Sequence, residues 1–202
     1  FWASLMIGRW TSAAGAFNLT EKLKSLLGFI LPFAAFGIFL GVNWIAGNSM
    51  AQFYPYLGIV ILLIIADKLS KGNPVNQIMI YSALGILALI IGIYSSGMTS
   101  VFAFISVGLF CSTLWPCIFT LGIAGMGQRT NTASSLLILM IMGGGFITLA
   151  QGTLAADDLL GIQQSYWVGV LCFAYLIYFA IRSSSILKSK GIHTFETAKS
   201  GH

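Results

Sequence analysis

Charged side chains are scarce in this sequence. Only 7% of its 202 residues are charged, whereas 57% are hydrophobic. A soluble domain has about 25% charged residues, so a chain this poor in charge cannot cover a surface that faces water. The scarcity therefore excludes an ordinary soluble domain and predicts side chains that face lipid or other helices.

Residue types that carry catalysis or bind metals are also few. The three cysteines, Cys111, Cys117 and Cys172, lie inside apolar stretches without a Cys-x-x-Cys spacing, and the two histidines, His193 and His202, lie near the C-terminus. No Asp, Glu, Lys or His falls in the middle of an apolar stretch, and no basic patch alternates with aromatic residues. We therefore expect no enzyme, no metal site, no cofactor and no nucleic-acid partner.

Long apolar runs are what the sequence has instead. A membrane-spanning helix needs about 20 apolar residues, and lipid offers its backbone no other hydrogen-bond partners. Seven runs fit this length: residues 1–19, 25–46, 49–66, 75–96, 100–124, 133–155 and 165–181. They predict an all-α, polytopic membrane protein with seven transmembrane helices within residues 1–182. The first run begins at Phe1 rather than at a Met, so we expect a truncation upstream of it.

Basic residues indicate the orientation. Nine of the ten Lys and Arg residues fall in alternate linkers or in the C-terminal tail, residues 183–202. They are Lys22, Lys24, Lys68, Lys71, Arg129, Arg182, Lys188, Lys190 and Lys199. Cytoplasmic loops carry an excess of Lys and Arg, so this side and the tail are predicted to be cytoplasmic.

Arg9 is the tenth basic residue and lies within the first apolar run. An ionised side chain at membrane depth is costly and usually faces a polar cavity. Arg9 is therefore a candidate cavity or gate residue. The alternative is an arginine that extends to the outer interface.

Trp115 and Pro116 lie together in the fifth run. Proline removes a backbone hydrogen bond, so a helix kink is expected at Pro116. Interrupted helices often line binding cavities, and Trp115 offers a flat face of the kind that stacks on a sugar ring. The alternative is an ordinary kinked helix with a lipid-facing tryptophan.

Polar and small residues share one face of the sixth run. Thr148 and Gln151 lie there with Gly144 and Ala155, and the three consecutive glycines 143–145 imply close packing or bending. Gln151 and Thr148 are candidate ligand-binding groups. A helix–helix hydrogen bond explains Gln151 equally well.

Two motifs give the chain a family resemblance. Gly8-Arg9, and the segment Trp115-Pro116-Cys-Ile-Phe-Thr-Leu-Gly-Ile, resemble helices eight and ten of the fucose–galactose–glucose:proton symporters of the major facilitator superfamily. Further matching positions follow in order: Met126-Gly127, Thr130, Ala133-Ser134-Ser135, Gly143 to Gly145 and Asp157. The resemblance implies a truncated major-facilitator-type bundle of helices eight to twelve. Residues 25–66 have no counterpart and are predicted to be an inserted helical hairpin.

The same resemblance implies a function and partners. We expect a permease that carries a monosaccharide (fucose, galactose or glucose), with a coupling proton, across the bacterial inner membrane. The missing N-terminal half would hold the coupling carboxylates and about half of the sugar site. From this half, Trp115 would stack on the sugar, Gln151 would bind its hydroxyls, and Arg9 would form a gate or tune the field. Ala133 and Leu149 depart from the usual Gly and Pro, and Leu149 bears on the bend of its helix and on sugar preference.

Two alternative functions fit parts of the sequence less well. A seven-helix receptor or photoreceptor matches the number of runs, but the last run has no Lys for a Schiff base. A membrane-embedded enzyme needs nucleophiles, acids or metal ligands near the membrane face, and these are lacking. Which sugar is carried, whether the ion is a proton or sodium, and the oligomeric state stay open from the sequence.

Overall fold

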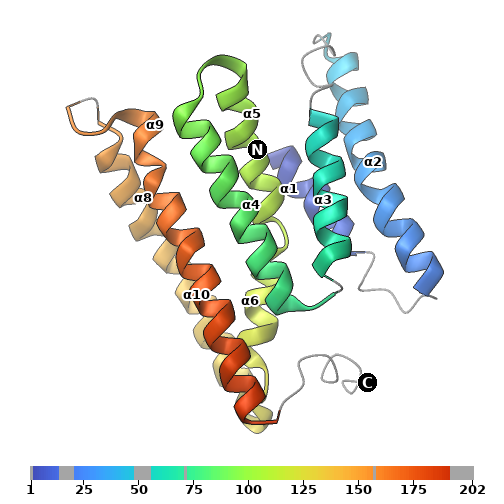
Figure 1. Cartoon of the computed structure of the whole chain (residues 1–202), viewed down its shortest axis with the longest axis vertical. Coiled ribbons are helices and arrows are strands. Elements are labelled where there is room, and N and C mark those ends of the chain that lie inside the picture. The colour runs from blue at the N-terminus through green and yellow to red at the C-terminus, as the bar shows by residue number, and fades with distance from the viewer. Residues whose placement is uncertain (1, 14–20, 48–55, 71, 157, 192–202) are drawn as a thin grey trace.

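The computed structural model describes residues 2–13, 21–47, 56–70, 72–156 and 158–191. Within these residues every regular element is a helix and none is a strand, so the predicted all-α class is confirmed (Figure 1). The helices are α1 Trp2–Ala13, α2 Glu21–Ile45, α3 Tyr56–Ser70, α4 Pro74–Tyr94, α5 Gly97–Cys111, α6 Leu114–Ile123, η3 Gly127–Arg129, α7 Thr130–Leu139, η4 Met140–Met142, α8 Gly143–Leu154, α9 Gly161–Ser165 and α10 Trp167–Ser189.

Five helical segments are long and apolar enough to cross a membrane. They are Leu26–Ile45, Pro74–Tyr94, Gly97–Ile123, Gly127–Leu154 and Gly161–Ser189. The first and third predicted runs correspond to α1 and α3, which have 12 and 15 residues in the described part of the chain. The chain is thus a multi-pass membrane protein, and the count of seven spans stays a prediction.

The last helix extends further than the sequence suggested. The predicted cytoplasmic tail begins at Ser183, yet α10 continues to Ser189 and Leu187 on it is buried. The physical reason is that Leu187, an apolar side chain in this otherwise polar segment, packs on the hydrophobic core. This contact keeps the backbone helical. Residues 192–202 of the predicted tail lie outside the described residues.

α4 is the central helix of the bundle. It packs against α10, α5, α6 and α3 (Figure 1). A Cβ atom added at Gly85 would lie 2.7 Å from the Phe173 ring on α10, and one added at Gly92 would lie 2.9 Å from the Phe104 ring on α5. Glycine at these positions lets aromatic rings of both neighbours reach the α4 backbone.

Polar side chains fix both ends of α4. Asn73 caps its start, because the Asn73 side chain accepts a hydrogen bond from the backbone N–H two residues on at 2.9 Å. Pro74 is the first helical residue, a position where its missing N–H has no helical partner to lose. At the other end Gln163 Nε2 lies 2.7 Å from the carbonyl oxygens of both Gly92 and Ser95. The amide thereby satisfies carbonyls that the helix end leaves without partners.

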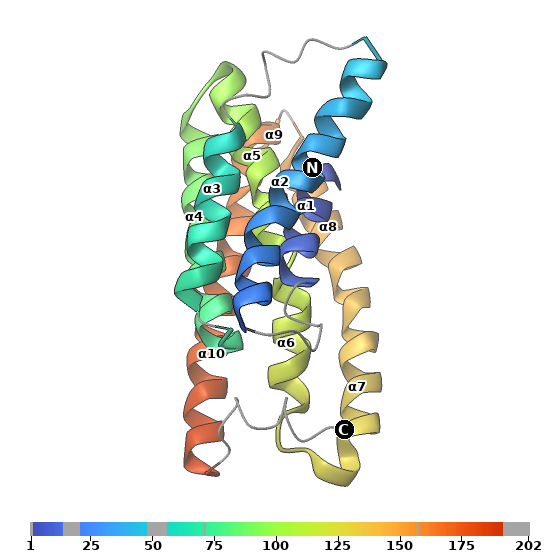
Figure 2. The same cartoon turned by 90° about the vertical axis from the view of Figure 1, so that its right-hand side faces the viewer.

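The predicted hairpin, residues 25–66, corresponds to α2 and α3. α2 lies at the edge of the bundle against α1 and α3 (Figures 1 and 2). α3 reaches the core, where its Val60 and Leu63 are 0% exposed, and the hydroxyl of Tyr56 donates to Oγ of Ser4 on α1 at 2.6 Å. α3 is therefore an integral part of the packing. That the pair is an insertion stays a prediction.

Candidate functional site

The fifth predicted span is interrupted in the middle. α5 ends at Cys111 and α6 begins at Leu114, with two turn residues between them. Pro116 lies in the first turn of α6, where a missing N–H costs least because those groups have no helical partner. The hydroxyl of Ser112 donates to the Leu109 carbonyl at 2.6 Å and satisfies part of the broken helix end. We call residues 111–116 the α5–α6 break.

α1 crosses this break at a glycine. A Cβ atom added at Gly8 would lie 2.7 Å from Cβ of Ser112 and 2.9 Å from the carbonyl oxygen of Leu109. These distances are shorter than real Cβ contacts, so the crossing requires a residue without a side chain. Arg9, the next residue, is thereby held beside the break with an exposed side chain.

Trp115 presents an aromatic face just past the break. Its side chain is 39% exposed, and its ring centroid lies 6.4 Å from that of Phe119, one turn further along α6. Pro116 and Thr120 on the same short helix are exposed too. An exposed tryptophan ring beside a threonine oxygen suits stacking on a ring with both apolar and hydroxyl faces.

Gln151 reaches the break from α8. It lines a cavity of about 320 Å³ together with Cys111 and Leu114 of the break and Tyr166 and Cys172 of the C-terminal helices. The cavity wall is apolar apart from a few groups, and among its side chains the Gln151 amide and the Tyr166 hydroxyl are the strongest hydrogen-bonding groups. A site of this kind holds a small ligand by shape and orients it by few polar contacts.

Thr148 lies on α8, one turn before Gln151, and is exposed. Its hydroxyl is 3.0 Å from the carbonyl oxygens of Gly144 and Gly145, so its proton is bonded within its own helix. Only its oxygen lone pairs remain for a ligand. Thr148 does not line the cavity that contains Gln151.

Three of the predicted site residues thus lie next to the α5–α6 break or line a cavity with residues of it, each through a separate contact. Arg9 reaches the break through the Gly8 crossing, Trp115 through its place after the break, and Gln151 through the shared cavity. Arg9 and Trp115 do not line that cavity. A group that sequence reasoning did not assign to the site is Thr113, whose fully buried hydroxyl has no hydrogen-bond partner in the break. A seven-residue spacing with Ser106 and Thr120 was its only signal.

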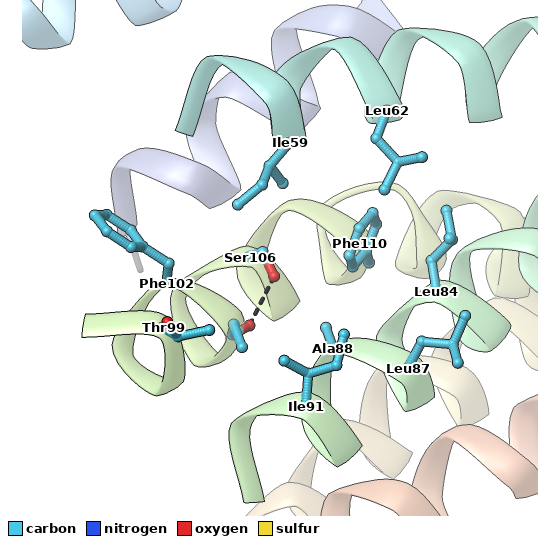
Figure 3. A pocket seen from close by; sticks show the side chains of 11 residues that line it. Ile59, Leu62, Leu84, Leu87, Ala88, Ile91, Thr99, Phe102, Ser106 and Phe110 are labelled. Carbon is cyan, nitrogen blue, oxygen red and sulfur yellow. Dashed lines mark hydrogen bonds between the residues drawn. The ribbon is translucent and has the colours of Figure 1, made fainter. Parts of the chain in front are cut away.

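A second cavity, of about 440 Å³, has a different character. It lies between α3, α4 and α5 and is lined by apolar side chains such as Ile59, Leu62 and Phe102 (Figure 3). The hydroxyl of Ser106 in its wall donates to the Ala103 carbonyl at 2.7 Å. A wall with so few available polar groups suits hydrocarbon and does not suit a sugar.

The comparisons with known proteins agree with the family resemblance. A glucose/galactose transporter of Brucella abortus is 33% identical over 99 residues, which are 49% of this chain and 24% of that protein. The L-fucose-proton symporter of Escherichia coli is 30% identical over 112 residues, 55% of this chain and 25% of that protein. No family model matches, and no solved structure matches.

These similarities confirm the resemblance to fucose–galactose–glucose:proton symporters. The aligned part spans about half of this chain and about a quarter of each relative's length. Both relatives are transporters and neither is an enzyme, and the receptor or photoreceptor alternative has no support among them.

Proposed function

We propose that the protein carries out secondary active transport of a monosaccharide (fucose, galactose or glucose) across the bacterial inner membrane, coupled to protons. The observation that carries this proposal is the similarity to a glucose/galactose transporter and to an L-fucose-proton symporter. Sugar and proton are accordingly the proposed cargo, and the lipid bilayer is the surroundings.

The site residues receive the following roles. Trp115 stacks on the apolar face of the sugar, which its exposure at the break supports. Gln151 donates to and accepts from sugar hydroxyls, which its place in the 320 Å³ cavity supports. Arg9 forms a gate or tunes the field beside the break, and Thr148 offers an acceptor at the edge of the site.

The remaining wall of the cavity is assigned to the N-terminal half of the permease. The segment Gly127–Leu154 supports this, because none of its residues is buried although its mean hydropathy is that of a membrane-spanning helix. Apolar side chains such as Met140, Met142 and Phe146 are 69–74% exposed there. Part of the exposed surface of this segment meets lipid. The part that carries Gln151 and Thr148 faces the N-terminal half of the permease across the sugar path.

The basic linkers are proposed to lie on the cytoplasmic side, with the C-terminus. Arg129 before α7, Lys68 near the end of α3 and Lys188 near the end of α10 all lie at ends of helices that the alternation predicts to be cytoplasmic. A cysteine placed in the C-terminal segment tests this orientation in intact cells. A membrane-impermeant thiol reagent added outside leaves a cytoplasmic cysteine unmodified, whereas modification would place the C-terminal segment outside.

Uptake by the complete protein tests the function. It is expressed in cells that lack their own sugar permeases, and labelled fucose, galactose and glucose are offered with and without a proton uncoupler. The expected result is uptake of one sugar that the uncoupler abolishes. Uptake that persists with uncoupler but needs sodium would replace the proton by sodium, and no uptake of any of the three would overturn the sugar assignment.

A further inference from the structure

A second group of polar side chains lies away from the sugar site, where α3, α4 and α6 meet. Nε2 of Gln77 donates to Oδ1 of Asp67 at 3.5 Å, and Sγ of Cys117 donates to Oε1 of Gln77 at 3.2 Å. One amide on α4 thus links a carboxylate on α3 to a thiol on α6. The group lies toward the end of the bundle that carries the basic linkers.

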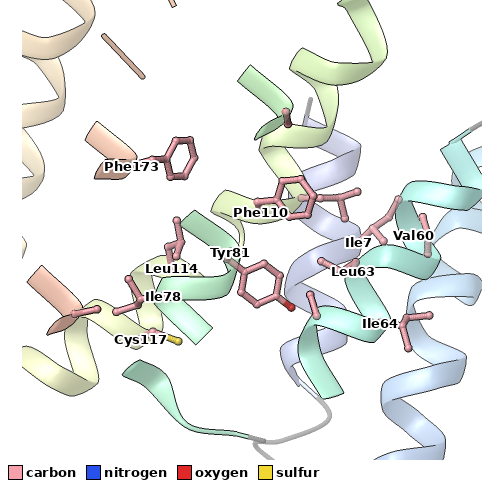
Figure 4. Packing of buried hydrophobic residues seen from close by; sticks show 14 of the residues in the cluster. Ile7, Val60, Leu63, Ile64, Ile78, Tyr81, Phe110, Leu114, Cys117 and Phe173 are labelled. Atoms are coloured by element: carbon pink, nitrogen blue, oxygen red, sulfur yellow. The ribbon is translucent and has the colours of Figure 1, made fainter. Parts of the chain in front are cut away.

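Tyr81 completes this group. It lies one helical turn after Gln77 on α4, so both side chains share a face. The side chain of Tyr81 is 0% exposed, and its hydroxyl has no hydrogen-bond partner. Figure 4 shows the hydroxyl directed toward α3, on the side of Leu63 and Ile64. A buried hydroxyl without a partner is unusual and indicates a state in which it bonds.

The chemistry of the group accommodates two protonation states of Asp67. An ionised carboxylate only accepts, and here the Gln77 amide donates to it. A protonated carboxyl has to donate a hydrogen bond. Rotation of the Gln77 side-chain amide by half a turn presents Oε1 of Gln77 as the acceptor. The amide N–H then faces Cys117, whose sulfur is a weak acceptor. The Tyr81 hydroxyl is free to donate to Asp67 in the ionised state.

No counter-charge among the described side chains holds Asp67 in one state, and Lys71, four residues further along, is not one of those side chains. Among the side chains that the structure describes around α3, the titratable groups that face Asp67 are Tyr81 on α4 and Cys117 on α6. Lys68, its neighbour on α3, points the other way, with Nζ 5.9 Å from the centroid of the Phe29 ring on α2. No described side chain forms an ion pair with Asp67. Glu21, Lys22 and Lys24 at the start of α2 lie outside the described side chains.

We propose that Asp67, with Gln77 and Tyr81, binds a proton from the water on the side of the basic linkers. We propose further that the bound proton stabilises the packing of α3 against α4 and α6, which we call the seating of α3. The proton enters and leaves as such, and no covalent bond is made or broken. The proposal goes beyond the proposed transport function and holds whichever solute is carried.

Burial supports the direction of this effect. Asp67 lies beyond the end of the third apolar run, and burial raises the pKa of its carboxyl above the ordinary value. A group whose pKa is raised in the packed state stabilises that state at low pH. The stabilisation is complete below the ordinary aspartate pKa and is lost as the pH rises through the raised one.

Infrared spectroscopy of the complete protein in lipid vesicles tests the proposal. The carbonyl band of a protonated carboxyl is followed through a pH titration in the parent, in Asp67→Asn and in Asp158→Asn, which changes an exposed aspartate in the linker before α9. Among the carboxyl bands of the complete protein, we expect a component with a midpoint above the ordinary aspartate pKa that is lost in Asp67→Asn and kept in Asp158→Asn, which the difference from the parent spectrum isolates. Retention of the band in Asp67→Asn overturns the proposal.

Tyr81→Phe keeps the test decisive if Asp67→Asn fails to fold, and the reactivity of Cys117 tests the packing of α3 separately. Tyr81→Phe retains Asp67 but removes the hydroxyl that favours the ionised state, so the midpoint moves to higher pH, and an unchanged midpoint overturns the proposal. In a Cys111→Ser/Cys172→Ser background, the maleimide reaction of Cys117 reports how tightly α3 is seated. At equal pH near neutrality it is slower in Asp67→Asn than with Asp67 present, and an equal rate contradicts a seating role. Sugar uptake is measured separately, so its failure leaves these readouts intact.

Discussion

Replacing Gly8 with alanine tests whether α1 crosses the α5–α6 break as closely as described. The new Cβ atom would lie 2.9 Å from the carbonyl oxygen of Leu109, a backbone atom that cannot turn aside, and 2.7 Å from Cβ of Ser112. Overpacking of this kind costs about 1–3 kcal/mol. Alanine recovers about 1 kcal/mol of helix propensity relative to glycine, so the net loss is about 0–2 kcal/mol, and about 1–3 kcal/mol relative to a glycine-to-alanine change without a clash.

The assay compares thermal unfolding of the complete protein carrying Gly8→Ala with that of Gly41→Ala. Gly41 lies in α2 with no atom within 4 Å of an added Cβ, so alanine there stabilises by up to about 1 kcal/mol or has no effect. Adding Ser112→Gly to Gly8→Ala removes the Cβ clash but leaves the carbonyl, so it restores part of the loss. If Gly8→Ala is as stable as Gly41→Ala, the described crossing is wrong, and with it the placement of Arg9 beside the break.

Three further predictions follow from single contacts. Trp115→Ala raises the KM for sugar by about tenfold, because losing a stacked aromatic contact costs about 0.5–1.5 kcal/mol beyond its area. Trp167 has the same 39% exposure, so Trp167→Ala is the matched control and leaves the KM unchanged. Gln163→Ala leaves the carbonyls at the end of α4 without their donor and lowers stability by about 1–3 kcal/mol, measured by thermal unfolding against Gln164→Ala. Tyr56→Phe removes the 2.6 Å hydrogen bond to α1 and costs about 0.5–1.5 kcal/mol, and no change in unfolding would show that this bond is absent.

The positions of the spans could be predicted because the membrane imposes one length and one composition on all of them. Interruptions inside a span were harder to place. Pro116 marked the break in the fifth run to within one turn, since proline cannot donate to the preceding turn. In the sixth run the 3-10 turn Met140–Met142 comes just before the three glycines, where the sequence indicated only bending or close packing.

Glycine shows why packing partners could not be predicted. Gly37 and Gly41 have the four-residue spacing typical of close helix pairs, yet an added Cβ at either position meets nothing within 4 Å. Close approaches between helices occur instead at Gly8, Gly85, Gly92, Gly122 and Gly169. Spacing identifies a stripe on one helix, whereas contact also depends on the rotation and tilt of the neighbour, which hydrophobicity does not fix.

The polar group around Gln77 was out of reach for a similar reason. Asp67 was visible in the sequence only as an acid at the end of a run, and Cys117 only as a small hydrophobic residue. Their link through one amide spans 40 residues between Gln77 and Cys117. Only the pairing of α4 with α3 on one side and α6 on the other makes the three side chains neighbours.

α3 is fixed at its two ends by contacts of different chemistry. Near its start the Tyr56 hydroxyl bonds to Ser4 on α1, and near its end Asp67 accepts from Gln77 on α4. Within a membrane apolar side chains gain little by exchanging lipid for a neighbouring helix, so polar contacts weigh more in deciding which helices stay together. Of the two contacts only the second contains a carboxyl. If Asp67 binds a proton as proposed, the change acts on one end of α3 while the other end stays bonded to α1, so we expect α3 to tilt about Tyr56 and to remain in the bundle.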